Sequence, residues 1–158
     1  MGCEVVSASE LLSTDFEPTV LRLFADRCAS LLARSDADWC VVLADDAFLT
    51  DLNTEFRGIE APTDVLSFPQ AEFPDGPNVG DLSVLGDVVI SVDTARRQAT
   101  EQGHSLGTEL EVLLVHGLCH LLGWDHVDPS DATAMVAVEQ RVLKAVGGGM
   151  GLVQRSAT

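Results

Sequence analysis

The chain has 158 residues and a mass of 16.8 kDa, and 46% of its residues are apolar, which predicts one domain with a buried core. Nine basic residues against 25 acidic ones give a net charge of −16, which excludes binding of nucleic acid or anionic membranes through bulk charge. No apolar run approaches the ~20 residues of a membrane-spanning helix, and the N-terminal MGCEVVSASE lacks the basic start and apolar block of a signal peptide.

The first third of the chain predicts two helices around a short strand. Apolar residues recur at helical spacing from Asp15 to Arg34, and the strand follows from Trp39 to Leu43. A second helix is expected from Asp45 to Phe56, with Gly58 as its stop signal.

Two further strands and three helices are expected in the rest of the chain. The strands are Val65 to Phe68 and Val84 to Ile90, and the Pro- and Gly-rich segment PQAEFPDGPNVG between them predicts a functional loop or flap. The predicted helices run from the cap Ser91 to Gln102, from Ser105 to Leu122, and from Ser130 to Val146. The second of these is apolar on nearly every side, so we expect it to be buried. The elements together predict an α+β fold, a small mixed sheet packed with helices.

The four cysteines, Cys3, Cys28, Cys40 and Cys119, form no CxxC pair. A domain of this size needs no disulfide framework, so free thiols in a reducing compartment are expected. The cytoplasm fits, and so does an organelle stroma or matrix.

The segment HGLCHLLGWDH carries the candidate chemistry. His116 and His120 are four residues apart and project from one face of the buried helix, while Gly123 lets the chain turn so that His126 can reach the same point. Three imidazoles with an open fourth position are typical of a catalytic zinc site, although nickel or copper would also suit them. A single histidine in an apolar helix is usually a hydrogen-bonded core residue, but three of the chain's four histidines fall in this window, which favours a metal.

The histidine spacing matches the zinc-peptidase pattern HExxHxxGxxH, except that Gly117 stands in place of the glutamate. That glutamate activates water against a peptide bond, so peptidase chemistry is disfavoured.

Arg57 is the second candidate site residue, in the segment NTEFRGIEAPTDVLSFP. Its functional interpretation is a planar donor group that holds a phosphate near the metal. The alternative is an arginine that only meets the dipole at the end of its helix.

The sequence resembles the YbeY family of metal-dependent endoribonucleases from about Ala44 to His126. Three motifs carry the resemblance, in the family's order and spacing: NTEFRGIEAPTDVLSFP, LGDVVIS and the highly specific HGLCHLLGWDH. The first 43 residues and the last 30 are less distinctive.

The resemblance implies a zincin-like α+β fold in which His116, His120 and His126 bind one divalent metal ion, expected to be Zn²⁺, beside an Arg57 that binds RNA phosphate. It further implies single-strand endoribonuclease activity in maturation of the 3′ end of small-subunit ribosomal RNA and in ribosome quality control. The expected partners are ribosomal RNA, the small ribosomal subunit and its assembly factors, without DNA or membrane, in a bacterial cytoplasm.

A mechanism follows from the motif analysis together with the family resemblance. The metal would activate a water or polarise a phosphoryl oxygen, while Arg57 offsets charge that grows on the phosphate. His116 could in addition leave the metal and relay a proton. Asp125 could orient an imidazole ligand or only complete the turn.

Structural roles are expected for the other polar residues near these motifs. Cys119 is expected to be a core thiol, since a fourth protein ligand would close the metal site. His104 is expected to face solvent, and Asp87 to make a structural hydrogen bond inside its strand.

Two pairs of residues could each have a structural or a functional role. Asp64 and Ser67 could cap the entry of a strand or contact substrate. Arg96 and Arg97 could extend a phosphate track, although a solvated helix face is the default.

Two rival functions remain. One is a metal hydrolase for a small phosphorylated molecule, and the other a non-catalytic ribosome-assembly factor whose metal organises the fold. The acidic composition also predicts weak affinity for free RNA, so a protein partner could supply recruitment.

Overall fold

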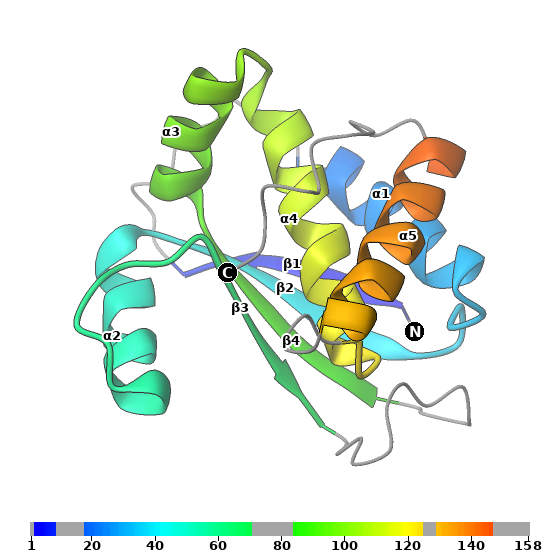
Figure 1. Ribbon diagram of the computed structural model, residues 1–158, viewed down its shortest axis with the longest axis horizontal. Helices are drawn as coiled ribbons and strands as arrows, with labels where there is room; N and C mark the ends of the chain where they lie inside the picture. The colour runs from blue at the N-terminus through cyan, green and yellow to red at the C-terminus, as the bar shows by residue number, and fades with distance from the viewer. Residues whose placement is uncertain (1, 9–17, 71–83, 125–128, 147–158) are drawn as a thin grey trace.

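The computed structural model describes residues 2–8, 18–70, 84–124 and 129–146 (Figure 1). Within them, one sheet contains the strands β1 (Cys3–Ser7), β2 (Asp38–Ala44), β3 (Val65–Pro69) and β4 (Val84–Ser91). The helices are α1 (Pro18–Leu31), α2 (Asp46–Arg57), α3 (Val92–Gln102), α4 (Leu106–Leu121) and α5 (Pro129–Val146). No helix in this part of the chain is long and apolar enough to cross a membrane. The expected flap lies mostly outside the described residues.

The sheet is mixed, with the strand order β1-β2-β4-β3. β1 runs parallel to β2, β2 runs parallel to β4, and β3 pairs antiparallel with β4 at the edge, where Val65 lies opposite Ile90. This arrangement confirms the α+β class and the mixed sheet that the sequence predicts.

β1 is the one strand that the sequence analysis did not predict. It pairs with β2 from Cys3 opposite Trp39 to Ser7 opposite Leu43. Only Cys3 within it is buried, so the strand shows no run of buried positions. The Cys3 amide donates to Asp26 Oδ1 at 2.9 Å, which ties the start of β1 to α1.

The helix ends follow the predicted caps. Asp45 accepts from the Phe48 amide at the start of α2, and Ser91 and Ser105 do the same for the third residue of α3 and α4. Gly58 and Gly103 end α2 and α3 in the left-handed conformation, which glycine adopts without steric cost.

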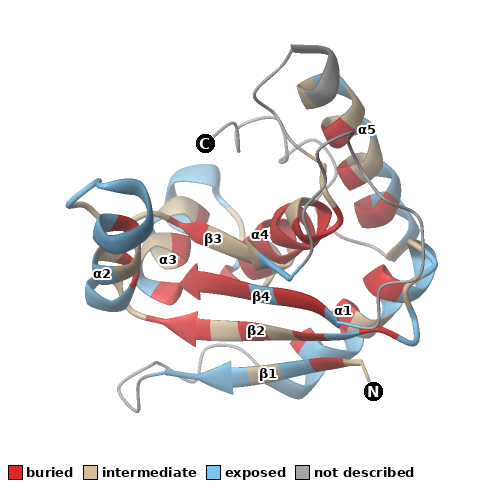
Figure 2. Ribbon diagram, turned by 90° about the horizontal axis from the view of Figure 1, so that it is seen from below, coloured by how far each residue is buried: buried red, intermediate tan, exposed pale blue. Residues whose placement is uncertain are grey.

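Each face of the sheet has its own apolar cluster. The larger cluster joins Val41, Leu43, Val88 and Ile90 to α1, α4 and α5, which lie side by side in Figure 1. On the other face, α2 contributes Leu49 and Leu52 to a smaller cluster with Ala44 and Val89. The partly buried Val42, Leu66 and Phe68 pack against this cluster. Figure 2 shows that, among the strands, burial is concentrated in β2 and β4, whereas most of β1 is exposed. The strongly apolar α4 is buried along most of its length, as predicted.

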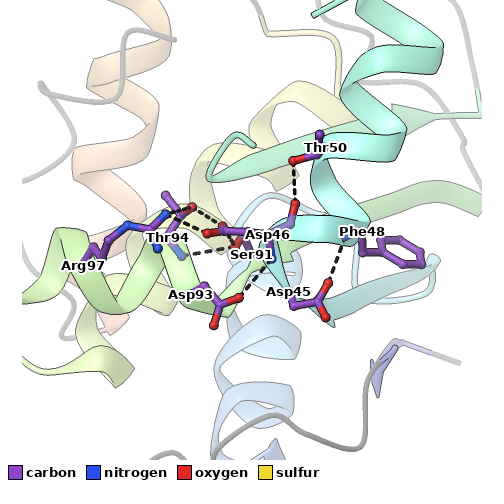
Figure 3. Close-up of polar contacts among 8 residues, drawn as sticks. All are labelled: Asp45, Asp46, Phe48, Thr50, Ser91, Asp93, Thr94 and Arg97. Carbon is purple, nitrogen blue, oxygen red and sulfur yellow. Dashed lines mark hydrogen bonds and ion pairs between the residues drawn. The ribbon is translucent and has the colours of Figure 1, made fainter. Parts of the chain in front are cut away.

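A carboxylate joins the start of α2 to the start of α3 (Figure 3). Asp46 Oδ1 accepts hydrogen bonds from Ser91 Oγ and Thr94 Oγ1, both at 2.6 Å, and Asp46 Oδ2 pairs with Arg97 Nη2 at 2.9 Å. Partial burial would raise the pKa of Asp46, but these three donors and the charge of Arg97 outweigh it and lower the pKa. Arg97 thus forms an ion pair with Asp46 from the exposed face of α3.

We expect Ser91→Ala to lower the free energy of unfolding by about 2 kcal/mol at neutral pH, because it removes both a helix cap and a donor to Asp46. Ser105→Ala, which removes a cap without a carboxylate partner, should cost about 1 kcal/mol. Urea denaturation of both variants measures the difference.

Ser91→Ala should lower the free energy of unfolding by more than Ser105→Ala does, and this difference should depend on pH. Because the folded-state pKa of Asp46 is lowered, its stabilisation is present above the ordinary carboxyl pKa and is lost as pH falls through the folded pKa. At acid pH the two variants should therefore lose similar amounts of unfolding free energy. Equal losses at neutral pH would contradict the role given to Asp46.

Candidate functional site

α4 places two histidines on one face. The rings of His116 and His120 lie with their centroids 4.8 Å apart and their planes at 78°. Both line a cavity of about 260 Å³ whose other lining residues are Arg57, Val65, Leu66, Ser67 and Pro69. The structure thus brings together three of the four residues that the sequence singled out. The fourth, His126, lies outside the described residues, as does Asp125.

Arg57 is held at the cavity by the way in which α2 ends. The Gly58 amide donates to Thr54 O at 3.1 Å and the Ile59 amide to Asn53 O at 3.2 Å, so the chain turns back directly after Arg57. The buried Asn53 side chain donates to Ala61 O at 2.8 Å and fixes the following segment. This turn leads the chain into β3, which forms one wall of the cavity.

Glu139 is a site residue that the sequence analysis missed. It projects from α5, and its Oε2 lies 2.9 Å from Nδ1 of His116, with both side chains almost fully buried. At this distance the carboxylate can accept a hydrogen bond from Nδ1–H, and such a bond would hold the tautomer and the plane of the ring. The only sequence signal was an acidic residue on the apolar face of the last helix.

Gly117 lies where α4 makes a close contact with β3 and β4. A Cβ at this position would lie 2.5 Å from Val88 Cγ1 and 3.2 Å from Ser67 Oγ. Ser67 Oγ donates to the carbonyl oxygen of Gly117 at 3.0 Å, so backbone and strand are in direct contact. A glutamate at this position would force Val88 or the helix to shift, so the close contact favours glycine where the peptidase pattern has glutamate.

The structure gives Asp64 and Ser67 structural partners. Asp64 Oδ1 accepts from the Val65 amide at 2.8 Å, as expected for a cap at the entry of a strand, and its Oδ2 accepts from Gln98 Nε2 at 3.2 Å. Ser67 holds α4 through Gly117 but also lines the cavity.

Cys119 is fully buried in the core. Burial raises the pKa of its thiol well above the ordinary value, which disfavours the thiolate that a metal would need. All four cysteines are free, in agreement with the prediction.

Two expectations were wrong. His104 does not face solvent: its Nε2 lies 2.7 Å from Oε1 of the fully buried Glu109, because the short turn before α4 brings the ring back onto the helix. Asp87 is exposed, so its carboxylate stays hydrated and needs no structural hydrogen bond.

The donor set fits a divalent metal with an anion beside it. Because Nδ1 of His116 is engaged by Glu139, Nε2 is the nitrogen that would bind a metal, and a carboxylate behind a histidine ligand is a frequent feature of such sites. Arg57 adds a permanent positive charge to the same cavity. No group of three potential ligands is complete within the part of the chain that the structure describes.

Comparisons with known proteins agree on one family. The family described as Endoribonuclease YbeY matches residues 7–147. An Endoribonuclease YbeY from Symbiobacterium thermophilum is 41% identical over 142 residues, 85% of this chain and 89% of that protein. Another from Moorella thermoacetica is 44% identical over 142 residues, 87% of this chain and 88% of that protein.

The solution structure of TM1509 from Thermotoga maritima shares the fold. It superposes with a TM-score of 0.62 at 22% identity and covers 91% of this chain and 88% of its own. This likeness supports the α+β class that the sequence predicts.

We expect Gly117→Ala to destabilise the protein by about 2 kcal/mol, because the added methyl group overpacks the contact with Val88. The matched control is Gly107→Ala in the same helix, where the nearest atom to a new Cβ is Ser105 Oγ at 3.9 Å. That substitution should stabilise by about 0.5 to 1 kcal/mol through helix propensity alone. Thermal and urea unfolding measure both, and a neutral Gly117→Ala would contradict the close approach.

Proposed function

The chain belongs to the endoribonuclease YbeY family, and we propose that it is a metal-dependent hydrolase that cleaves single-stranded RNA internally. The observation that carries the proposal is the shared cavity of Arg57, His116 and His120. Imidazoles that can hold a metal and a guanidinium that can hold a phosphate are brought together from α4 and α2.

We propose that His116 and His120, with His126 as the third ligand, hold one Zn²⁺ ion. The ion would supply Lewis acidity to the phosphodiester and to the attacking water. The chain itself supplies rigidity, since both described ligands lie on a buried helix and His116 is oriented by Glu139. Zinc identity and the proton relay by His116 remain predictions.

Arg57 is proposed to bind and orient the phosphate. Its planar donor group can form two parallel hydrogen bonds to phosphate oxygens, and its charge offsets negative charge that grows during cleavage. The structure supports this role by placing Arg57 in the wall of the cavity that the histidines line.

The proposed biological substrate is ribosomal RNA, at the 3′ end of the small-subunit RNA, in the cytoplasm. Because the chain carries a net charge of −16, we propose that the small ribosomal subunit or its assembly factors bring the protein to its substrate.

An RNA-cleavage assay with a single-stranded ribosomal 3′-end fragment tests the proposal. We expect cleavage to stop on chelation and to return with zinc. His120→Ala should lose both metal and cleavage, whereas Arg57→Ala should keep the metal and lose about a hundredfold in rate.

Each alternative has its own outcome. Loss of metal from Arg57→Ala would show that Arg57 is structural. A fully metal-loaded wild-type protein without cleavage would overturn the nuclease and favour an assembly factor.

Glu139→Gln should weaken zinc binding by about 10- to 100-fold, because the amide keeps the shape but removes the charge that holds the His116 ring. Competition with a chromophoric chelator measures the affinity. The matched control is Glu109→Gln, which changes another buried glutamate at the far end of α4 and should leave zinc affinity unchanged. Equal affinities for Glu139→Gln and wild type would contradict the orienting role.

A further inference from the structure

The cavity borders the free edge of β3. This strand pairs with β4 on one side only and lies at the opposite edge of the sheet from β1 (Figure 2). The cavity is lined by Val65 and Ser67, which pack on the α4 side, and by Leu66, which packs on the α2 side. Because successive residues of a strand point to opposite faces, a cavity that touches both sets borders the backbone itself.

Arg57 and the histidines reach this cavity from opposite faces of the sheet. α2, which ends at Arg57, packs on the face of Val89, whereas α4 packs on the face of Val88. The free edge of β3 therefore lies between the helix that carries Arg57 and the helix that carries the histidines. A ligand group that contacts both sides also meets the backbone of this strand.

The hydrogen bonds between β3 and β4 show which backbone groups point outward. The Ser91 amide donates to Asp64 O at 2.9 Å, and the Gln70 amide donates to Leu85 O at 3.0 Å. Bonded and non-bonded pairs alternate in an antiparallel ladder, so every second residue from Asp64 to Gln70 bonds to β4. The backbone groups of the three residues between them point to the free edge: Val65, Ser67 and Pro69.

Of these three residues, only Ser67 offers an amide to a ligand. The Val65 amide donates to Asp64 Oδ1 at 2.8 Å, and Pro69 has no amide hydrogen. No described residue accepts a hydrogen bond from the Ser67 amide, since the hydroxyl of Ser67 is the group that bonds to Gly117.

A single outward donor suits a compact acceptor rather than a polypeptide strand. A strand added to a sheet edge uses the amides of alternate residues along that edge, and two of the three positions here supply none. The cavity of about 260 Å³ is also smaller than pockets for drug-sized ligands, which begin at about 300 Å³. Both features fit one phosphate group.

We infer that the Ser67 amide donates a hydrogen bond to an oxygen of the phosphodiester that Arg57 is proposed to bind, an inference that rests on the proposed function. The phosphate is then held by a charged donor and by a neutral donor from the sheet edge. Because the amide belongs to a paired strand, it needs no reorganisation when substrate binds. It also adds affinity without adding positive charge.

A backbone ester at residue 67 tests the inference, because it replaces the N–H with oxygen and keeps the side chain. Cleavage of a short single-stranded RNA by the zinc-loaded protein should fall about 10- to 100-fold in kcat/KM. Binding of the same RNA with chelator present should weaken about 10-fold, and zinc content should not change.

The matched control is an ester at Val5 of β1. Gly2 and Ala8 bond β1 to β2, so the Val5 amide also points to a free edge, at the other side of the sheet. Each ester weakens the preceding carbonyl, which bonds to the neighbouring strand, so both proteins should lose similar stability in thermal melting. The ester at Val5 should leave cleavage and RNA binding unchanged.

Two substitutions repeat the comparison without an ester. Ser67→Pro removes the amide hydrogen and Ser67→Ala keeps it, while both lose the hydroxyl that bonds to Gly117. An edge strand accepts proline at an outward position, as Pro69 shows. Ser67→Pro should cleave about 10- to 100-fold more slowly than Ser67→Ala, and equal rates in the folded pair would contradict the contact.

The outcomes distinguish this inference from the function on which it rests. Zinc-loaded wild type that cleaves no single-stranded RNA would overturn the proposed function together with the inference. Wild type that cleaves no faster than the ester at residue 67 would overturn the inference and leave the nuclease intact. Loss of zinc from that ester protein would overturn the inference by showing that the amide supports the fold of the site.

Discussion

The close approach of α4 to the sheet at Gly117 is the contact on which the site depends. No side chain fits between the helix and Val88, and Ser67 donates directly to the Gly117 carbonyl. Together these contacts fix both the depth and the rotation of the helix. Because His116 and His120 are one residue before and three residues after the glycine, the same contacts direct both imidazoles to the cavity beside β3.

The same contact restricts the chemistry. A helix pressed this closely on a strand has no room for a carboxylate beside the first histidine, so the chain must obtain its other charged groups from elsewhere. Arg57 comes from the end of α2, and Glu139 reaches His116 from α5 on the opposite side of the helix. The guanidinium of Arg57 faces the cavity, whereas the carboxylate of Glu139 lies on the Nδ1 side of the His116 ring. In the proposed function, the positive group would meet the substrate and the negative group would support the metal-binding imidazole, which suits an anionic phosphodiester better than a neutral peptide bond.

The sequence predicted what local rules determine. The caps at Ser91 and Ser105 and the stop at Gly58 depend on single residues and their immediate neighbours, and the histidine spacing depends on helix geometry alone. Glu139 could not be found in this way, because its contact with His116 spans 23 residues and depends on how α5 docks. β1 was missed because a mostly exposed strand shows no burial pattern. The contact of His104 was missed because it depends on the turn before α4, which places the ring against Glu109.

An acidic protein gains selectivity from a site with little positive charge. A broad basic surface would attract every polyanion, folded or not, whereas a net charge of −16 repels them all until specific contacts form. Among the described residues that line this cavity, Arg57 supplies the one permanent positive charge. In the proposed function, this scarcity of positive charge is the reason why a protein partner, rather than bulk attraction, would bring the chain to its RNA.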